Sequence, residues 1–151
     1  MRFTTYLTTL IAALVTSVSG VCLKQPPSPI WSPGGTYPMP IDIAETRPNQ
    51  LTFIIPANST GPCQLVANFP YGYPMTSTGS DLVYVTALNG PAEGSLVGAL
   101  RFRPDSTTVF VNSFACRSMM AYSLSIAQGA GEVSFGQTRD AGMFMEVGDC
   151  Y

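Results

Sequence analysis

The chemistry open to this chain is limited by the absence of histidine from all 151 residues. Without an imidazole, neither a Ser-His-Asp site nor a Cys-His site can be assembled, and the usual histidine metal ligands are missing. The single lysine, Lys24, lies between Cys22 and a run of prolines, which is a poor place for a buried Ser-Lys pair. No glycine-rich loop follows a strand and opens a helix, as phosphate-binding loops do. The sequence therefore predicts no cofactor and no catalytic nucleophile.

Paired carboxylates are the one catalytic device that the composition leaves open. A glycosidase needs two of them facing one cleft at a defined separation. Most of the nine carboxylates flank turns or begin strands, where acidic side chains are ordinarily solvated: Asp42, Glu45, Asp81, Glu93, Asp105, Glu132, Asp140, Glu146 and Asp149. We therefore predict a non-catalytic protein without catalytic residues, and we keep a carboxylate-based glycan hydrolase as the alternative.

All four cysteines follow residue 20. An even number of cysteines in a chain that enters the oxidising secretory route indicates two disulfides. Three pairings are possible, of which we favour Cys63–Cys116 within the body of the chain and Cys22–Cys150 between its ends. A zinc site is disfavoured, because no two cysteines stand at the short spacing that zinc sites use. The cysteines therefore predict a cross-linked protein without a metal.

Residues 1–20 have the pattern of a secretory signal peptide. Arg2 provides the positive end, residues 6–15 (YLTTLIAALV) form the apolar segment, and Ser17-Val18-Ser19 offers small residues for cleavage. The apolar segment is shorter than the roughly 20 residues that span a bilayer. We expect the mature protein to be secreted and to have no attachment to the membrane after cleavage.

Charge and composition narrow the range of partners and folds. The net charge is −2 and only 11% of the residues are charged. Such a chain lacks the basic surface that neutralises phosphates, so we expect no nucleic-acid partner. Glycine (14 residues) and proline (13 residues) are abundant, whereas the helix formers Lys and Glu are scarce. This composition favours short strands and turns over long helices.

Three aromatic residues and one asparagine are candidates for contact with other molecules. Trp31, the only tryptophan, could recognise a sugar or a protein, or it could pin its segment to the domain surface. Tyr71 and Tyr73 lie in a segment that we expect to be a loop, where they could stack on sugar rings or pack at the end of a sandwich. Asn58-Ser59-Thr60 is a glycosylation sequon in a turn.

The chain is expected to have three parts. Residues 1–20 are the leader, residues 21–50 form a proline-rich arm that ends in a first edge strand, and residues 51–151 form the domain. Six of the thirteen prolines lie between Pro26 and Pro40. Because proline excludes both a regular helix and a central strand, we expect this part of the arm to be extended.

Within the domain, apolar alternation predicts an all-β protein, an antiparallel β-sandwich of about eight short strands. We expect Leu51, Phe53 and Ile55 to share the core face of one strand, and Cys63, Leu65, Ala67 and Phe69 to share that of the next.

Later strands follow the same pattern. We expect Leu96, Leu100 and Phe102 to share a face, and likewise Phe110, Asn112, Phe114 and Cys116. Residues 70–79 are expected to form a loop. Residues 119–121 are the only segment after the leader that could form a helical turn.

The order of motifs also resembles a known family. An apolar strand ends at Pro56, and later segments are Cys63-Gln64-Leu65, Phe69-Pro70, Phe114-Ala115-Cys116, Val133-Ser134-Phe135-Gly136-Gln137 and Ala141-Gly142-Met143-Phe144. Over roughly residues 51–150 this pattern resembles the fungal domain family named after the C-terminal domain of a ubiquitin-3-binding protein. The resemblance implies a β-sandwich, secretion by a filamentous fungus, no assigned catalytic residues and paired cysteines at Cys63 and Cys116. The leader argues against the intracellular partner to which the family name refers.

These observations predict a secreted, disulfide-stabilised, non-catalytic binding or cell-surface protein of a fungus. Its partner would be a cell-wall polysaccharide or an extracellular or host protein, recognised through Trp31, Tyr71 or Tyr73. Besides the hydrolase, a purely structural wall protein is the remaining alternative.

Overall fold

In a computed structural model of the protein, residues 21–29 and 33–151 are described. The expected signal peptide and Trp31 lie outside these residues. Within them the chain forms eleven strands, one 3-10 turn and no α-helix. The elements are β1 (Leu23–Gln25), η2 (Pro33–Gly35), β2 (Met39–Ala44), β3 (Asn49–Ile54), β4 (Cys63–Asn68), β5 (Met75–Gly79), β6 (Val83–Ala87), β7 (Leu96–Leu100), β8 (Thr108–Phe114), β9 (Met119–Ile126), β10 (Gly131–Gln137) and β11 (Gly142–Val147).

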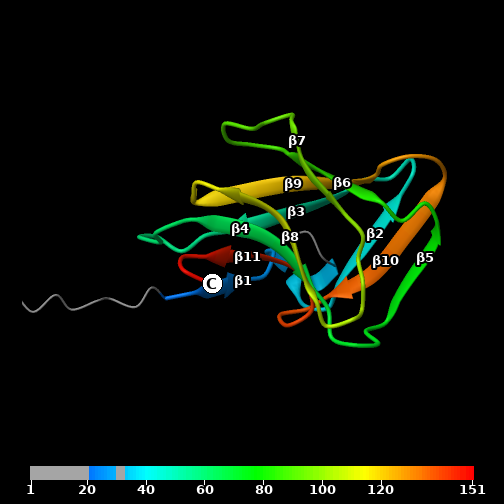
Figure 1. The fold of residues 1–151 in the computed structure, drawn as a ribbon, viewed down its shortest axis with the longest axis horizontal. Helices are drawn as coiled ribbons and strands as arrows, with labels where there is room; N and C mark the ends of the chain where they lie inside the picture. The colour runs from blue at the N-terminus through cyan, green and yellow to red at the C-terminus, as the bar shows by residue number, and fades with distance from the viewer. Residues whose placement is uncertain (1–20, 30–32) are drawn as a thin grey trace, which may run out of the picture.

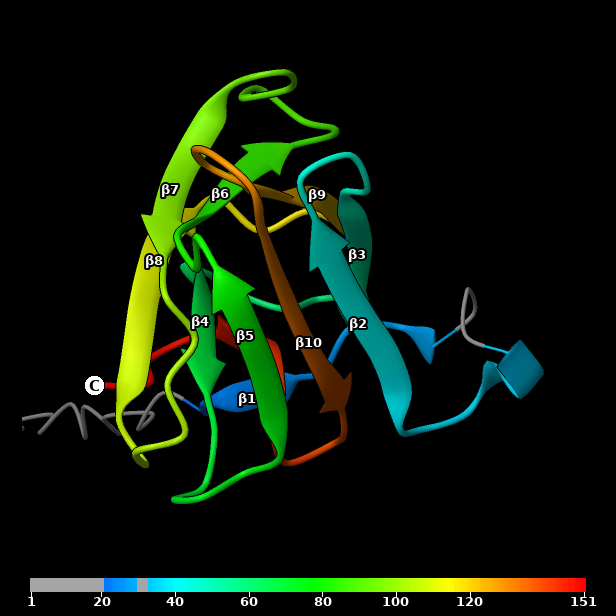
Figure 2. The same cartoon turned by 90° about the vertical axis from the view of Figure 1, so that its right-hand side faces the viewer.

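The strands form three antiparallel sheets packed around one core (Figures 1 and 2). The terminal sheet has the order β1-β11-β4-β8, the three-stranded sheet β2-β10-β5, and the β9 sheet β3-β9-β6-β7. Every connection except the one between β6 and β7 passes from one sheet to another. The prediction of an all-β antiparallel sandwich is confirmed, with eleven strands where about eight were expected.

One apolar cluster fills the space between the three sheets. Ile43 of β2, Phe53 of β3 and Leu65 of β4 come from different sheets, and all three are 0% exposed. Burial of a side chain of this size stabilises the fold by roughly 1.5–3 kcal/mol. Because every sheet contributes to the same cluster, the sheets form a single domain.

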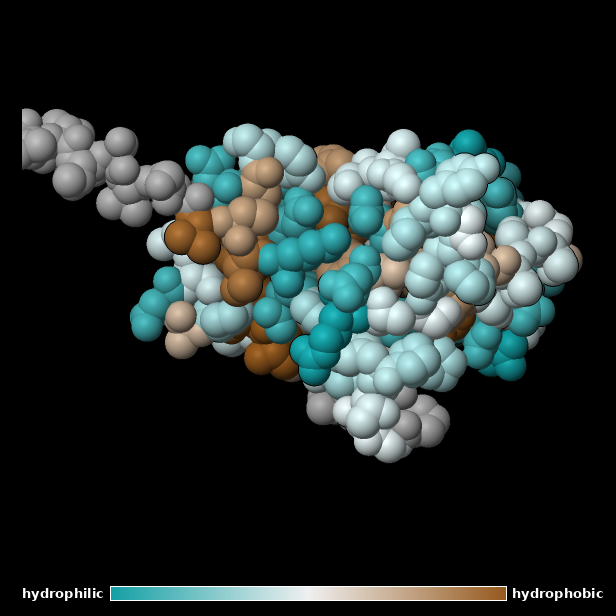
Figure 3. Space-filling model, turned by 90° about the horizontal axis from the view of Figure 1, so that it is seen from below, coloured by the Kyte–Doolittle hydropathy of each residue, from teal (hydrophilic) through white to brown (hydrophobic). Residues whose placement is uncertain are grey.

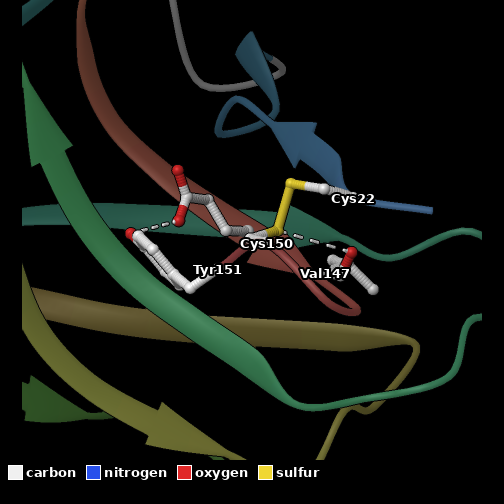
Figure 4. Close-up of a disulfide and its surroundings, with 5 residues drawn as sticks. Cys22, Val147, Cys150 and Tyr151 are labelled. Atoms are coloured by element: carbon white, nitrogen blue, oxygen red, sulfur yellow. Dashed lines mark hydrogen bonds between the residues drawn. A yellow bond between two sulfur atoms is a disulfide. The ribbon is translucent and has the colours of Figure 1, made fainter. Parts of the chain in front are cut away.

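The two disulfides join the pairs favoured from the sequence. Cys63, at the start of β4, is fully buried and is bonded to Cys116, which follows β8. Cys22 precedes β1 and is bonded to Cys150, near the end of the chain, across a sequence separation of 128 residues (Figure 4). The terminal sheet therefore holds both ends of the described chain.

The proline-rich arm is part of the sheets. Its first strand, β1, pairs with β11, and its last, β2, pairs with β10 along six residues. Both are edge strands, so Pro40 within β2 interrupts no central ladder. Lys24 places its ammonium 4.0 Å from the ring centroid of Phe144, which gives the only lysine a structural contact. The expected boundary between residues 50 and 51 falls inside β3.

Two predictions of which residues share a strand face are wrong because of β-bulges. In β8 the register shifts opposite Leu65 and Val66, so Val111 is an extra residue. The extra residue turns Phe110 outward, where it is 55% exposed, and leaves Asn112 and Phe114 half-buried. In β7 a similar shift at Val97 turns Leu96 outward to 55% exposure, while Leu100 and Phe102 are buried as expected.

Two secondary-structure predictions are also wrong. Residues 119–121 belong to β9, in which Met119 and Met120 pair with Ile54 and Phe53. Residues 75–79, expected within a loop, form the edge strand β5 and pair with β10. β5 contains no buried residue, so the apolar alternation that reveals other strands is absent from it.

No helix in the described part of the chain is long and apolar enough to cross a membrane.

Candidate ligand-binding face

The outward face of the three-stranded sheet is an open trough of small side chains. Figure 2 looks onto this sheet, with β10 in its centre and β2 and β5 at its edges. We call this face the polar trough and define it by Pro38, Pro40, Asp42, Ala44, Pro74, Thr76, Thr78, Glu132, Ser134 and Gly136. Met75 and Phe135 also line the hollow at the proline end of this face.

Strand alternation explains why these residues face outward. In β2, Met39, Ile41 and Ile43 are buried in the core, which leaves the residues between them on the opposite face. In β10, Val133 and Phe135 are buried in the same way. The polar trough is therefore the outward half of an ordinary one-sided sheet.

A row of oxygen-bearing side chains crosses the middle of the polar trough. Strand register places Asp42 of β2, Ser134 of β10 and Thr76 of β5 side by side. The Ser134 hydroxyl donates a hydrogen bond of 2.5 Å to Oδ1 of Asp42. The second carboxylate oxygen can accept a further hydrogen bond, and the Thr76 hydroxyl can accept or donate one. Recognition of a hydroxyl-rich ligand requires such a mixture.

Prolines and a glycine shape one end of the polar trough. Pro38, Pro40 and Pro74 surround Gly136 in a hollow of about 500 Å³. A Cβ at position 136 would be 3.4 Å from the Cβ of Pro38 and 3.8 Å from the hydroxyl of Tyr73. The absence of a side chain at Gly136 deepens the hollow, although an alanine would also fit there.

The other end of the polar trough is more acidic. A second hollow, of about 430 Å³, is lined by Ala44, Glu45, Thr78 and Glu132 among others. Arg47 approaches Glu132 at 3.8 Å, in an exposed ion pair. Among the residues that line the two hollows there are three carboxylates and no basic side chain. This charge disfavours an anionic ligand.

The hydropathy of the surface agrees with this description. In Figure 3 the apolar residues gather toward the left of the view, and the right-hand end is mainly hydrophilic or neutral. The three-stranded sheet lies at that right-hand end (Figure 1).

The residues proposed from the sequence for recognition are separated by the fold. Tyr71 is 86% exposed, in the loop that leads from β4 to β5. Tyr73 is half-buried: its ring packs at 5.5 Å from that of Phe69, and its hydroxyl donates a 2.6 Å hydrogen bond to the carbonyl of Gly136. Tyr73 therefore supports the fold. Of the pair, Tyr71 alone is available to a ligand.

The sequon asparagine is accessible. Asn58 is exposed in the turn between β3 and β4 and has a positive φ of 63°. The amide of Ser59 donates to the carbonyl of Pro56 at 3.3 Å, which closes the turn and presents Asn58 at its corner. An exposed turn of this kind suits the attachment of a glycan.

Most of the nine carboxylates have local partners. Asp81 forms an ion pair with Arg101, with 2.9 Å between Oδ1 and Nε, and Glu146 accepts a hydrogen bond from Tyr151. Hydrogen bonds from Thr107 lower the pKa of Asp105, whose carboxylate fixes the loop before β8. Only Asp42 and Glu132 share the sheet face of the polar trough, two register positions apart. Within the described residues, no three Asp, Glu, His or Cys side chains are grouped to hold a metal ion.

Asp42, Ser134 and Thr76 were not predicted from the sequence as a group. The signal for the first two was present, because each lies between buried residues of a strand and must face outward. Their adjacency depends on the pairing of β10 with both β2 and β5, which joins segments up to 92 residues apart.

Comparison with family models, curated proteins and solved structures finds no significant match to this chain. The resemblance to the fungal family therefore stays a prediction. The fold and the site define a disulfide-bonded, all-β protein with an open polar sheet face.

Proposed function

We propose that this is a secreted, non-catalytic fungal protein that binds a neutral cell-wall polysaccharide along the polar trough. The observation that carries the proposal is the row of Asp42, Ser134 and Thr76 on an open sheet face, next to the hollow that the prolines line. Paired hydroxyl and carboxylate groups match the alternating donors and acceptors of sugar hydroxyls.

The dimensions and charge of the polar trough support this ligand class. β10 has seven residues, so the trough is about 23 Å long at ~3.3 Å per residue, which accommodates several sugar units in a row. The lining carboxylates and the lack of basic lining residues disfavour acidic polysaccharides and phosphate-bearing partners. Tyr71 adds an exposed ring in the loop between β4 and β5, three residues before Pro74 of the trough.

Secretion is supported by the leader and by the two disulfides, which are typical of oxidising compartments. A non-catalytic role is supported by the absence of histidine from the chain and by the local partners of most carboxylates.

The test is retention of the secreted protein on insoluble β-glucan and chitin, with two matched variants. Ser134→Arg places a long side chain across the centre of the polar trough and should lower retention at least tenfold. Ser123→Arg makes the same chemical change at a half-buried serine on the outward face of β9, in a different sheet, and should leave retention unchanged.

Each outcome decides between the hypotheses. A wild-type protein that is retained on neither polymer would contradict polysaccharide binding and favour a purely structural wall protein. An equal loss of retention in both serine variants would show that the polysaccharide does not bind in the polar trough. Release of soluble sugars during incubation, abolished by Asp42→Asn, would instead establish the hydrolase.

A further inference from the structure

A second, more enclosed space lies on a different part of the molecule. The long loop between β6 and β7 and the turn between β8 and β9 enclose a cavity of about 160 Å³. Its apolar lining includes Ala87, Pro91, Phe114, Met120 and Tyr122. An apolar cavity of about 150 Å³ is large enough to take a benzene molecule. One six-membered ring therefore fits this space.

The walls of the cavity are held in place without a ligand. The side chain of Asn89 accepts a hydrogen bond from the amide of Ala121 and donates one to the carbonyl of Met119, each at 3.1 Å. These bonds fix the β6–β7 loop over β9. Between the lining residues Ala115 and Arg117, Cys116 is bonded to Cys63 in the core. A preformed cavity lowers the ordering cost of binding.

The lining of the cavity includes the side chain of Tyr122. Tyr122 is only 3% exposed, and its ring packs at 5.4 Å from that of Phe114. Burial raises its pKa, so the phenol is a neutral donor at physiological pH. Among the described residues, no hydrogen bond to its hydroxyl is found. The hydroxyl can therefore donate a hydrogen bond to a ligand oxygen, or accept one from a ligand hydroxyl.

The rim of the cavity has one positive charge. Arg117 lines the cavity and is exposed, and its Cδ and Nε would lie 3.5 Å from a Cβ at Gly90. In the part of the chain that the structure describes, no carboxylate lies within ion-pair distance of it. A guanidinium with a planar fork of donors binds a carboxylate through two hydrogen bonds.

We propose that this cavity binds a small phenolic carboxylic acid. The ring occupies the apolar space beside Phe114 and Met120, the phenolic oxygen meets the hydroxyl of Tyr122, and the carboxylate pairs with Arg117. The site is separate from the polar trough, which is formed by other strands, so the two ligands do not compete.

The experiment is calorimetric titration of the full secreted protein with 4-hydroxybenzoate, benzoate and phenol. The wild type should bind 4-hydroxybenzoate most tightly of the three, because only this probe engages both polar groups. Arg117→Gln should weaken 4-hydroxybenzoate at least tenfold and should leave phenol unchanged, since the guanidinium pairs with the carboxylate alone. Tyr122→Phe should reduce the preference for 4-hydroxybenzoate over benzoate.

Two controls make the result decisive. Arg103→Gln removes an exposed arginine outside the cavity lining and should leave all three affinities unchanged. Ala92→Leu adds bulk at a half-buried lining position and should abolish binding of every probe, while its thermal midpoint shows that the chain is folded. If the wild type binds none of the probes, or if Arg117→Gln and Arg103→Gln behave alike, the proposal is overturned.

Discussion

Tyr73 and Tyr71 are two residues apart, but only Tyr73 is held by the fold. Gly136, whose carbonyl accepts the Tyr73 hydroxyl, pairs with Pro40 on β2. On its other side β10 pairs with β5, where Met75 lies opposite Phe135. The next position of β5, opposite Gly136, is Pro74. Neither proline has an N–H, so the phenol supplies the donor that both neighbouring strands lack.

The first prediction concerns this hydrogen bond. Tyr73→Phe should lower the free energy of unfolding by about 1 kcal/mol, because it leaves a part-buried carbonyl without a donor. The matched control is Tyr71→Phe at a side chain that is 86% exposed, which should change stability very little. Urea unfolding of both variants measures the difference. Equal effects would contradict a structural role for the Tyr73 hydroxyl.

Two glutamines give a similar contrast inside the molecule. Gln137 is 0% exposed: its Oε1 accepts from the amide of Met143 at 2.7 Å, and its Nε2 donates to the carbonyl of Thr138 at 2.8 Å. These bonds close the corner between β10 and β11. Gln64, in β4, has a buried Oε1 for which no partner is found among the described residues.

The second prediction follows from this difference in hydrogen bonding. Gln137→Met should cost roughly 1–3 kcal/mol, because the amide of Met143 would remain buried without an acceptor. Gln64→Met removes an oxygen that makes no hydrogen bond there and should be neutral or stabilising. Urea unfolding distinguishes the two. A larger loss for Gln64→Met than for Gln137→Met would refute the assignment.

At the level of elements, the sequence predicted strands wherever one face is buried. β3 and β4 show this alternation, and their core residues were predicted from it. β5 has no buried residue, so its pairing with β10 could not be read from pattern. The bulges of β7 and β8 could not be predicted either, because each depends on the partner strand and reverses the phase partway along.

The candidate site shows the same limit. Outward positions of β2 and β10 could be assigned from their alternation, but the polar trough is created by pairing between distant segments. The cavity also combines two loops, 88–95 and 115–118, that no local pattern connects. The cysteine pairs were accessible to reasoning because only three pairings exist, whereas β-pairings are far more numerous.

Both bulges lie where the β9 sheet meets the terminal sheet. The Asn112 side chain donates to the carbonyl of Val97 at 2.6 Å, which joins the two bulged regions. At the same place, a Cβ added to Gly98 would be 2.6 Å from Cγ1 of Val111 and 3.2 Å from its carbonyl oxygen. The close approach of β7 to β8 therefore depends on a glycine.

The third prediction tests this seam between the sheets. Gly98→Ala should destabilise the fold by roughly 1–3 kcal/mol through overpacking against Val111. Val111→Ala in the same chain should relieve part of this cost, so the two changes should be non-additive. Gly136→Ala is the control, because its nearest contact would be an ordinary 3.4 Å. Thermal unfolding of the four variants measures the coupling, and strict additivity would contradict the contact.

At the scale of the whole molecule, the chain crosses between sheets at almost every connection, so most contacts join distant segments. Such a topology is slow to form, since loop-closure entropy is lost before the contacts stabilise it. The disulfides reduce this cost by restricting the unfolded chain. Cys22–Cys150 spans 128 residues and Cys63–Cys116 spans 53.

The fourth prediction ranks the two disulfides. Loop entropy alone gives each of them roughly 4–5 kcal/mol, with a difference of under about 1 kcal/mol in favour of the longer loop. Burial reverses this order, because Cys63 is 0% exposed in the core whereas Cys22 is exposed. Replacing Cys63 and Cys116 by alanine therefore removes the cross-link and also opens a cavity, which adds about 1 kcal/mol or more. The Cys63→Ala/Cys116→Ala variant should unfold at a lower temperature and urea concentration than Cys22→Ala/Cys150→Ala. The opposite order would mean that closure of the chain ends outweighs the packing of the core sulfur.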